Sequence, residues 1–166
     1  MKKTILYLCA FSIAGFISAQ DLAMVTSHAD EPVSLSSVSN KNYVENSILY
    51  IKRVKEIQFK VASFNVKNLS IYTPNEPATY QVSFNTEENN VTASYNHNGE
   101  LLKSKEKYIN IRLPLEVSSK LSKAYPNWFF SETVCTVQYD KNSGTVVKYK
   151  IILEKKGKKK TVSLTI

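Results

Sequence analysis

Strict alternation of apolar and polar residues marks several strands, because successive side chains of a β-strand point to opposite faces of a sheet. In the first half of the chain, the alternating apolar positions are Tyr80, Val82, Phe84, Val91, Ala93 and Tyr95. In the second half, they are Val147, Tyr149, Ile151, Leu153, Val162, Leu164 and Ile166. Further strands are expected over 100–108 and 134–139, which gives a sheet of about six strands.

Turn residues separate these strands, so consecutive strands are expected to pair antiparallel. The strongest signal is Asn98-Gly99, since a type I′ turn requires positive φ at both central positions. The segment 141–144 predicts a second turn, and the charged segment 154–160 predicts another hairpin tip.

A helical period of 3.6 residues appears between two prolines, Pro114 and Pro126. The apolar stripe of this helix consists of Val117, Leu121, Ala124 and Tyr125. Pro114 is expected at the first helical position, where its missing N–H has no partner to lose. Pro126 ends the helix, because the residue before a proline disfavours the α region.

An earlier helix is predicted from Asn46 or Ser47, and its apolar face consists of Tyr50, Val54, Ile57, Val61 and Phe64. Ile57, Phe59 and Val61 also alternate, so a strand is the alternative for the second half of this segment. A short strand is expected over 68–73, followed by a loop at Pro74 and Pro77.

Together these elements predict an α+β fold, in which an antiparallel sheet carries two helices on its one apolar face. The segments 47–108 and 113–166 each consist of a helix and three strands, so we expect two repeats within one domain, 47–166. The predicted contacts between the second helix and the sheet join Val117, Leu121 and Tyr125 to Val82, Tyr149 and Ile151.

The N-terminal region has the pattern of an export signal over residues 1–19. Lys2 and Lys3 precede an apolar run that is too short to span a bilayer, and cleavage is expected near Ala19. Residues 20–46 show no sustained period and are expected to form an extended or flexible arm, with an added edge strand as the alternative. We therefore expect a periplasmic or secreted protein with no transmembrane segment in the mature chain.

The positive charge of the chain is nearly all lysine. The formal net charge is +8 at pH 7, and Arg53 and Arg112 are the only arginines. Nucleic acid is not an expected partner, because its recognition relies on arginine as well as lysine. We expect a protein or an anionic envelope polymer instead. The candidate binding residues are Lys155, Lys156, Lys158, Lys159 and Lys160, for which a solvated hairpin tip that blocks edge pairing is the structural alternative.

An aromatic cluster, Trp128, Phe129 and Phe130, follows the second helix. Aromatic side chains often anchor interfaces, so Trp128 is a further candidate binding residue. We nevertheless expect at least two of the three in the core, because they run from the helix end onto a strand.

Residue types that support catalysis do not combine into a site. Cys135 lies in a strand, and no base is placed near it, because His28 and His97 lie in polar segments. The adjacent Glu87 and Glu88 would point to opposite faces of a strand. Metal-ligand spacing and a glycine-rich phosphate loop are also missing, so no metal or cofactor is expected. The sequence predicts a protein without enzymatic activity, with a small secreted hydrolase as the alternative.

Four segments, Ala93–Leu101, Leu113–Pro114, Tyr125–Trp128 and Val147–Ile151, resemble the PepSY-like, beta-lactamase-inhibitor-like family of small exported bacterial proteins. The resemblance covers roughly 78–166. Asn127 stands where the family often has glycine, and asparagine tolerates the left-handed region. The resemblance implies a binding module of the cell envelope, with inhibition of another protein as one mode of action. A purely structural envelope protein is the alternative.

Overall fold

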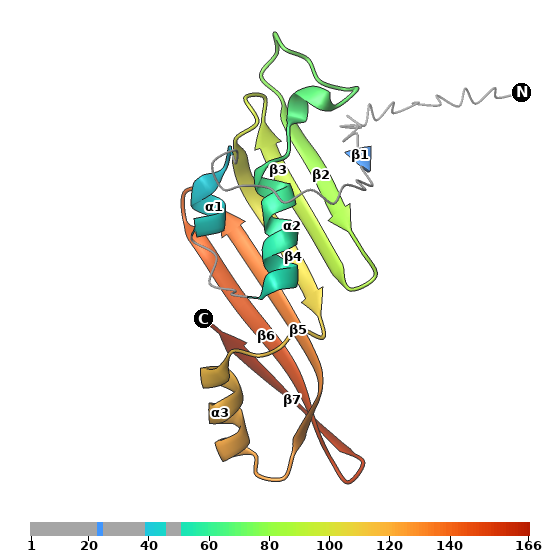
Figure 1. Ribbon diagram of the computed structural model, residues 1–166, viewed down its shortest axis with the longest axis vertical. Helices are drawn as coiled ribbons and strands as arrows, with labels where there is room; N and C mark the ends of the chain where they lie inside the picture. Colours follow the sequence, from blue (N-terminus) through green and yellow to red (C-terminus); the bar gives the residue numbers. More distant parts are fainter. Residues whose placement is uncertain (1–22, 25–38, 46–50) are drawn as a thin grey trace, which may run out of the picture.

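The computed structural model describes residues 23–24, 39–45 and 51–166 (Figure 1). The predicted signal peptide and most of the predicted arm lie outside these residues. The elements in chain order are β1 (Ala23–Met24), α1 (Lys41–Glu45), α2 (Lys52–Ala62), the 3-10 helix η2 (Val66–Asn68), β2 (Thr79–Asn85), β3 (Asn89–Asn96), β4 (Leu101–Ile109), α3 (Leu115–Ala124), β5 (Phe129–Asp140), β6 (Gly144–Lys155) and β7 (Lys158–Thr165).

The strands form one sheet of seven, in the same order as in the sequence. Strands β2 to β7 pair antiparallel with their neighbours, and β1 pairs parallel with β2. The predicted arm therefore contributes an edge strand. The predicted α+β class with an antiparallel sheet is confirmed. A helix followed by three strands occurs twice in the element order, while an internal repeat stays a prediction.

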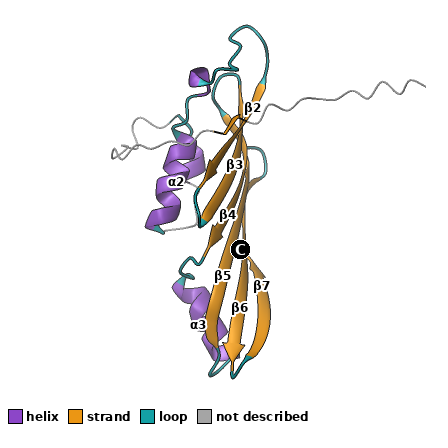
Figure 2. Ribbon diagram, turned by 90° about the vertical axis from the view of Figure 1, so that its right-hand side faces the viewer, coloured by secondary structure: helices purple, strands orange, loops and turns teal. Residues whose placement is uncertain are grey.

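The helices α2 and α3 lie on the same face of the sheet (Figure 2). Val82, Val117, Leu121, Tyr149 and Ile151 are all buried in one hydrophobic cluster between these helices and the sheet. We call the opposite face, which no described helix covers, the open face.

The helix α2 begins later than predicted. Its N-cap residue Ile51 has extended backbone angles (φ −99°, ψ 122°), so this helix does not continue back to the predicted start at Asn46 or Ser47, which lie outside the described residues. Val54 and Val61 are buried as expected, and the helix continues to Ala62, which excludes a strand in its second half.

Two other local predictions are wrong. Residues 41–45 of the predicted arm form the short helix α1, in which Tyr43 is buried. The segment 68–73 contains no strand, because η2 ends there and the chain turns: the Tyr72 N–H donates to the Leu69 carbonyl (3.0 Å).

The helix α3 forms where the prolines place it. Pro114 is the N-cap residue, with ψ 145°, rather than the first helical residue. Ala124 is exposed and does not belong to the buried stripe, which faces the sheet through Val117 and Leu121. Asn127 has φ 64°, which agrees with its expected left-handed conformation.

The hairpin at Asn98-Gly99 has a different turn from the predicted one. Gly99 has φ 84°, whereas Asn98 is not among the positive-φ residues of the described chain. The Gly99 N–H donates to the Asn96 carbonyl (3.0 Å), and the register shifts between Ser94 and Tyr95. This is the pattern of a three-residue loop with a bulge.

A two-residue turn of the predicted type forms instead between β6 and β7. Lys155 pairs with Lys158, and the intervening Lys156 and Gly157 have φ 48° and 75°. Positive φ at both central positions defines a type I′ turn, which matches the twist of the flanking strands.

Candidate functional site

The middle of the open face carries lysines from two strands. On β4, Lys103, Lys105 and Lys107 alternate with buried residues, and on β6 Lys148 and Lys150 do the same. Because side chains alternate along a strand, all five lysines lie on the open face. None of these five lysines is among the binding residues predicted from the sequence, although their spacing of two residues is a visible signal.

Strand pairing arranges these lysines in two columns, with β5 between them. Lys107 pairs with Thr136, and Thr136 pairs with Lys148. These two lysines therefore stand two strands apart, about 10 Å, while neighbours in one column stand about 7 Å apart. Lys150 lies beside Val134, and Lys105 beside Gln138. The columns form a grid of separated positive charges.

Only one of the five lysines is neutralised by a neighbour. The Lys103 ammonium lies 3.0 Å from Asp140 Oδ2. Hydrogen bonds from the Asn142 backbone and from Lys103 lower the pKa of Asp140 to about 2. Within the described residues, the exposed lysines 105, 107, 148 and 150 have no ion-pair partner. They are available to an external anion.

The other carboxylates of the open face lie toward its end near α3. Glu132 pairs with Ile152 across β5 and β6, and Glu154 pairs with Lys159 of β7. The central part of the face therefore carries positive charge alone among the described side chains.

A shallow cavity of about 540 Å³ lies on the open face next to the β4 lysines. Its lining includes Gln81, Thr92, Ser94, Lys103, Lys105 and Gln138. Hydroxyl and amide groups donate and accept hydrogen bonds, and ammonium groups donate them. This surface can hydrogen-bond anionic and neutral polar groups of one ligand.

The predicted lysine tract lies elsewhere, at the tip of the β6–β7 hairpin. Lys155 Nζ donates to the Pro126 carbonyl (3.3 Å), and Lys160 Nζ lies 4.6 Å from the centroid of the Tyr125 ring. These two lysines point toward the α3 side. Lys159, which pairs with Glu154, lies on the open face. The structure therefore divides the tract between two faces.

The aromatic cluster is more exposed than predicted. Trp128 is half-buried against the core, but Phe129 and Phe130 are 56% and 37% exposed, so the expectation that at least two of the three lie in the core is wrong. The reason is that β4 ends at Ile109, which pairs with Val134. The first residues of β5 extend beyond it and have no β4 residue beside them.

A buried carboxylate on β4 was missed by the sequence analysis. Glu106 is completely buried, and its Oε1 accepts hydrogen bonds from Tyr43 Oη (2.6 Å) and Ser104 Oγ (2.7 Å). Its Oε2 accepts from Tyr108 Oη (2.6 Å) and Gln58 Nε2 (3.0 Å). A buried charge is costly unless hydrogen bonds replace its hydration. The alternation of lysine with Ser104, Glu106 and Tyr108 carried the signal for this position.

This Glu106 cluster fixes the protonation of its tyrosines. Burial and then the charge of Glu106 raise the pKa of Tyr43 and of Tyr108 well above the usual range for tyrosine. Both hydroxyls are therefore donors at neutral pH. The cluster joins α1, α2 and β4 through hydrogen bonds. Because Glu106 has no exposed surface, its carboxylate cannot contact a dissolved substrate.

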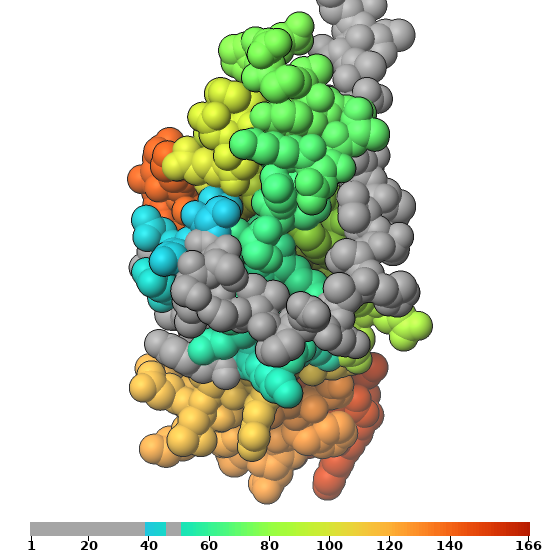
Figure 3. All heavy atoms as spheres, turned by 45° about the horizontal axis from the view of Figure 1, so that its top comes forward, coloured from blue at the N-terminus to red at the C-terminus, as the bar shows by residue number. Residues whose placement is uncertain are grey.

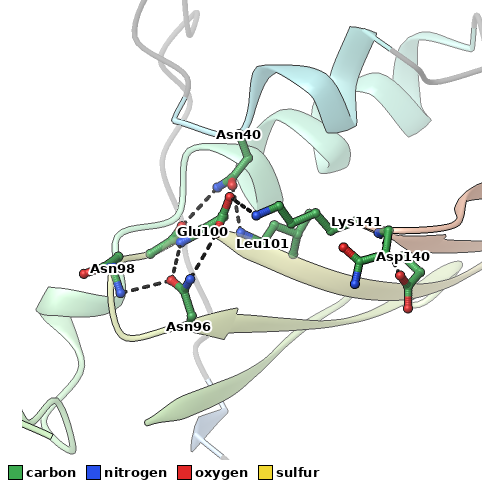
Figure 4. Close-up of polar contacts among 9 residues, drawn as sticks. Asn40, Asn96, Asn98, Glu100, Leu101, Asp140 and Lys141 are labelled. Atoms are coloured by element: carbon green, nitrogen blue, oxygen red, sulfur yellow. Dashed lines mark hydrogen bonds and ion pairs between the residues drawn. The ribbon is translucent and has the colours of Figure 1, made fainter. Parts of the chain in front are cut away.

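Asn40 fastens the segment before α1 to the β3–β4 hairpin (Figure 4). The Leu101 N–H donates to Asn40 Oδ1 (2.7 Å), and Asn40 Nδ2 donates to the carbonyl of Gly99 (3.2 Å) and to that of Ala62 (3.2 Å). One side chain thus ties residue 40 to α2 and to β4.

A second cavity, of about 440 Å³, lies beside this contact. Its lining includes Asn40, Tyr43, Glu100, Tyr139 and Lys141. Figure 3 shows α1 next to the turns that precede β4 and β6. Lys141 Nζ lies 2.5 Å from Glu100 Oε1 and lowers the pKa of Glu100. Lys141 and Glu100 therefore already neutralise each other at the edge of this cavity.

Among the residues considered for catalysis, Cys135, Glu87, Glu88 and His97 are described by the structure, and His28 lies outside the described residues. Burial raises the pKa of Cys135 to about 12, so the thiol is protonated at neutral pH and is a poor nucleophile. Glu88 forms an ion pair with Arg53, and Glu87 is exposed. His97 lies in the three-residue loop.

The described residues contain no group of three or more His, Cys, Asp or Glu side chains that could hold a metal ion. No helix among them has the length and the apolar composition needed to cross a bilayer.

Comparisons with protein families, with curated proteins and with solved structures gave no match. The resemblance to the PepSY-like family stays a prediction from sequence.

Proposed function

We propose that this protein is an exported binding module without enzymatic activity, and that its open face binds a linear anionic polymer of the cell envelope. The observation that carries the proposal is the grid of lysines at positions 105, 107, 148 and 150, which have no ion-pair partner among the described residues. The pattern of residues 1–19 supports export.

The spacing of the charges favours a polymer over a small anion. A small anion is held by donors that converge on one point, whereas these lysines stand about 7–10 Å apart on an open surface. Each lysine can therefore pair with a different anionic group of one chain. Several weak contacts on one molecule act together, because the first contact raises the effective concentration of the others.

The chemistry of lysine favours a ligand recognised by charge rather than by shape. The ammonium group is a compact charge on a flexible stem, and both arginines, Arg53 and Arg112, lie off this grid. Exposed ion pairs of this kind are screened by salt over a Debye length of about 8 Å at physiological ionic strength. Binding should therefore weaken steeply as salt is added.

Two variants with equal loss of charge test the site. The face variant changes Lys105, Lys107, Lys148 and Lys150 to glutamine, and the tip variant changes Lys155, Lys156, Lys158 and Lys160 to glutamine. The tip variant keeps Lys159, which lies on the open face. The probes are poly-L-glutamate and long-chain polyphosphate, and binding is measured by calorimetry at several salt concentrations.

The face variant is expected to bind about tenfold more weakly or worse, since each exposed ion pair contributes about 0.2–1 kcal/mol. Its binding should also depend less on salt. The tip variant should stay close to the wild-type protein. Loss of binding in the tip variant alone would move the site to the hairpin tip. Wild-type protein that binds neither probe at low salt would overturn the proposed function.

A further inference from the structure

The outer side of β7 is unpaired within the described chain, since β7 ends the strand order of the sheet. Val147 and Ile166 exchange two backbone hydrogen bonds, of 3.2 and 2.8 Å. In an antiparallel pair such residues alternate with residues whose backbone groups point the other way. The backbone N–H and C=O groups of Val162 and Leu164 therefore point toward β6. Those of residues 161, 163 and 165 point outward.

This edge lacks the features that usually prevent strands from pairing. Natural edge strands are protected by charges, prolines or bulges. Residues 161–166, Thr-Val-Ser-Leu-Thr-Ile, contain no charge, proline or glycine, and the β6–β7 register has no shift. Thr161, Ser163 and Thr165 are exposed, and Ile166 is 54% exposed. Lysines protect only the beginning of the strand, at 158–160.

We propose that two copies of this chain pair through β7, antiparallel and about a two-fold axis at Ser163. In this register Ser163 lies opposite Ser163 of the second copy, and Thr161 lies opposite Thr165. Each pair exchanges two backbone hydrogen bonds, so every outward group of residues 161, 163 and 165 gains a partner. On the helix side, Val162 meets Leu164 of the second copy in an apolar cross-strand pair.

Charge favours the antiparallel orientation of the two copies. Parallel pairing would place the two lysine tracts 158–160 side by side, and like charges directly opposite destabilise a sheet. The antiparallel register places the two lysine tracts at opposite ends of the interface, so the neutral segments 161–165 of the two copies pair with each other. The interface is self-complementary, and its two-fold symmetry closes the assembly at two chains.

The two-fold axis of an antiparallel strand pair is perpendicular to the sheet, so both open faces lie on the same side of the dimer. Lys150 of one copy and Lys150 of the other are then three strands apart, about 14 Å. This separation exceeds the Debye length of about 8 Å at physiological salt, so their repulsion is screened. The inference goes beyond the proposed function and does not depend on it.

The test measures the mass of the full chain by light scattering and sedimentation equilibrium, from micromolar to millimolar concentration and without any polyanion. A reversible dimer is expected. Ser163→Lys places two ammonium groups opposite each other at the two-fold axis and should weaken the dimer at least tenfold. Ser163→Thr, an uncharged change at the same exposed position, should preserve it. Circular dichroism checks that both variants fold.

Cysteine cross-linking tests the register. The two copies of Ser163→Cys lie about 5.5 Å apart between Cα atoms, within the disulfide range, and should cross-link under mild oxidation more than the wild-type protein. Thr161→Cys should not, because the two copies of residue 161 are about 14 Å apart. A protein that stays monomeric at millimolar concentration overturns the proposal. So does a dimer that Ser163→Lys leaves unchanged, or equal cross-linking at both positions.

Discussion

Tyr43 donates a hydrogen bond of 2.6 Å to Glu106 across a separation of 63 residues. This contact joins α1, which precedes the main body of the sheet in the sequence, to the middle of β4. Glu106 has no cation beside it among the hydrogen bonds and ion pairs of the described residues. Its charge is stabilised by four neutral donors, Tyr43, Gln58, Ser104 and Tyr108. The stability of the fold therefore depends on polar groups as well as on apolar packing.

Removal of one donor should destabilise the protein. Tyr43→Phe takes one of two hydrogen bonds from Glu106 Oε1 and is expected to lower the free energy of unfolding by about 1–3 kcal/mol. Urea titration followed by circular dichroism measures the change. Tyr139→Phe is the matched control, because the Tyr139 ring packs against Tyr43 but its hydroxyl makes no hydrogen bond among the described residues. A loss of similar size in both variants would contradict the importance of the hydroxyl.

Substitution of the acceptor should be more damaging. Glu106→Gln keeps the shape but replaces one accepting oxygen with an NH₂ group, which faces two donors. Leaving these donors unpaired in the core is expected to lower the free energy of unfolding by about 2–5 kcal/mol, which is a large effect for a single substitution. Glu87→Gln, an exposed change of the same kind, should alter stability by less than about 0.5 kcal/mol. Equal stability of Glu106→Gln and the wild-type protein would show that the carboxylate carries no such role.

Stability should fall at alkaline pH. Burial raises the pKa of Cys135 from 9.0 to about 12, so folding favours the protonated thiol. This stabilisation is present below pH 9 and is lost as the pH rises toward 12. Burial also raises the pKa of Tyr43 and Tyr108, which adds to the same trend. Urea titrations at several pH values measure the change. Above pH 9 the free energy of unfolding should decline less in Cys135→Ala than in the wild-type protein. Equal declines in both proteins would contradict the role of the thiol.

The β6–β7 turn should accept a stabilising substitution. Lys156 has φ 48°, a conformation that asparagine adopts more readily than lysine. Asn-Gly is also the preferred pair of a type I′ turn, so Lys156→Asn is expected to raise the melting temperature by a few degrees. Lys159→Asn, on the strand, removes the same charge and serves as the control. A gain of equal size in the control would assign the effect to charge.

The local pattern of the sequence determined the main strands and the antiparallel pairing of those joined by short turns. Alternation at Tyr80, Val82, Tyr149 and Ile151 places apolar side chains on one face, and short turns between consecutive strands permit only antiparallel neighbours. The helix between the two prolines was largely predictable, because its approximate limits and its buried residues Val117 and Leu121 are encoded within a few residues.

Tertiary structure decided the features that depend on distant residues. The loop at Asn98-Gly99 has three residues, and the strand register shifts between Ser94 and Tyr95. The exposure of Phe129 follows from the end of β4 at Ile109. No local pattern gives these positions.

The same division holds for the candidate site and for the Glu106 cluster. The spacing of Lys105 and Lys107 is visible in the sequence, but their distance from Lys148 depends on the register of β5. The partners of Glu106 likewise come from α1 and α2, far along the chain. Sequence fixes which face of its own strand a side chain occupies, because backbone geometry is local. Its neighbours are decided by packing and register, which involve the whole chain.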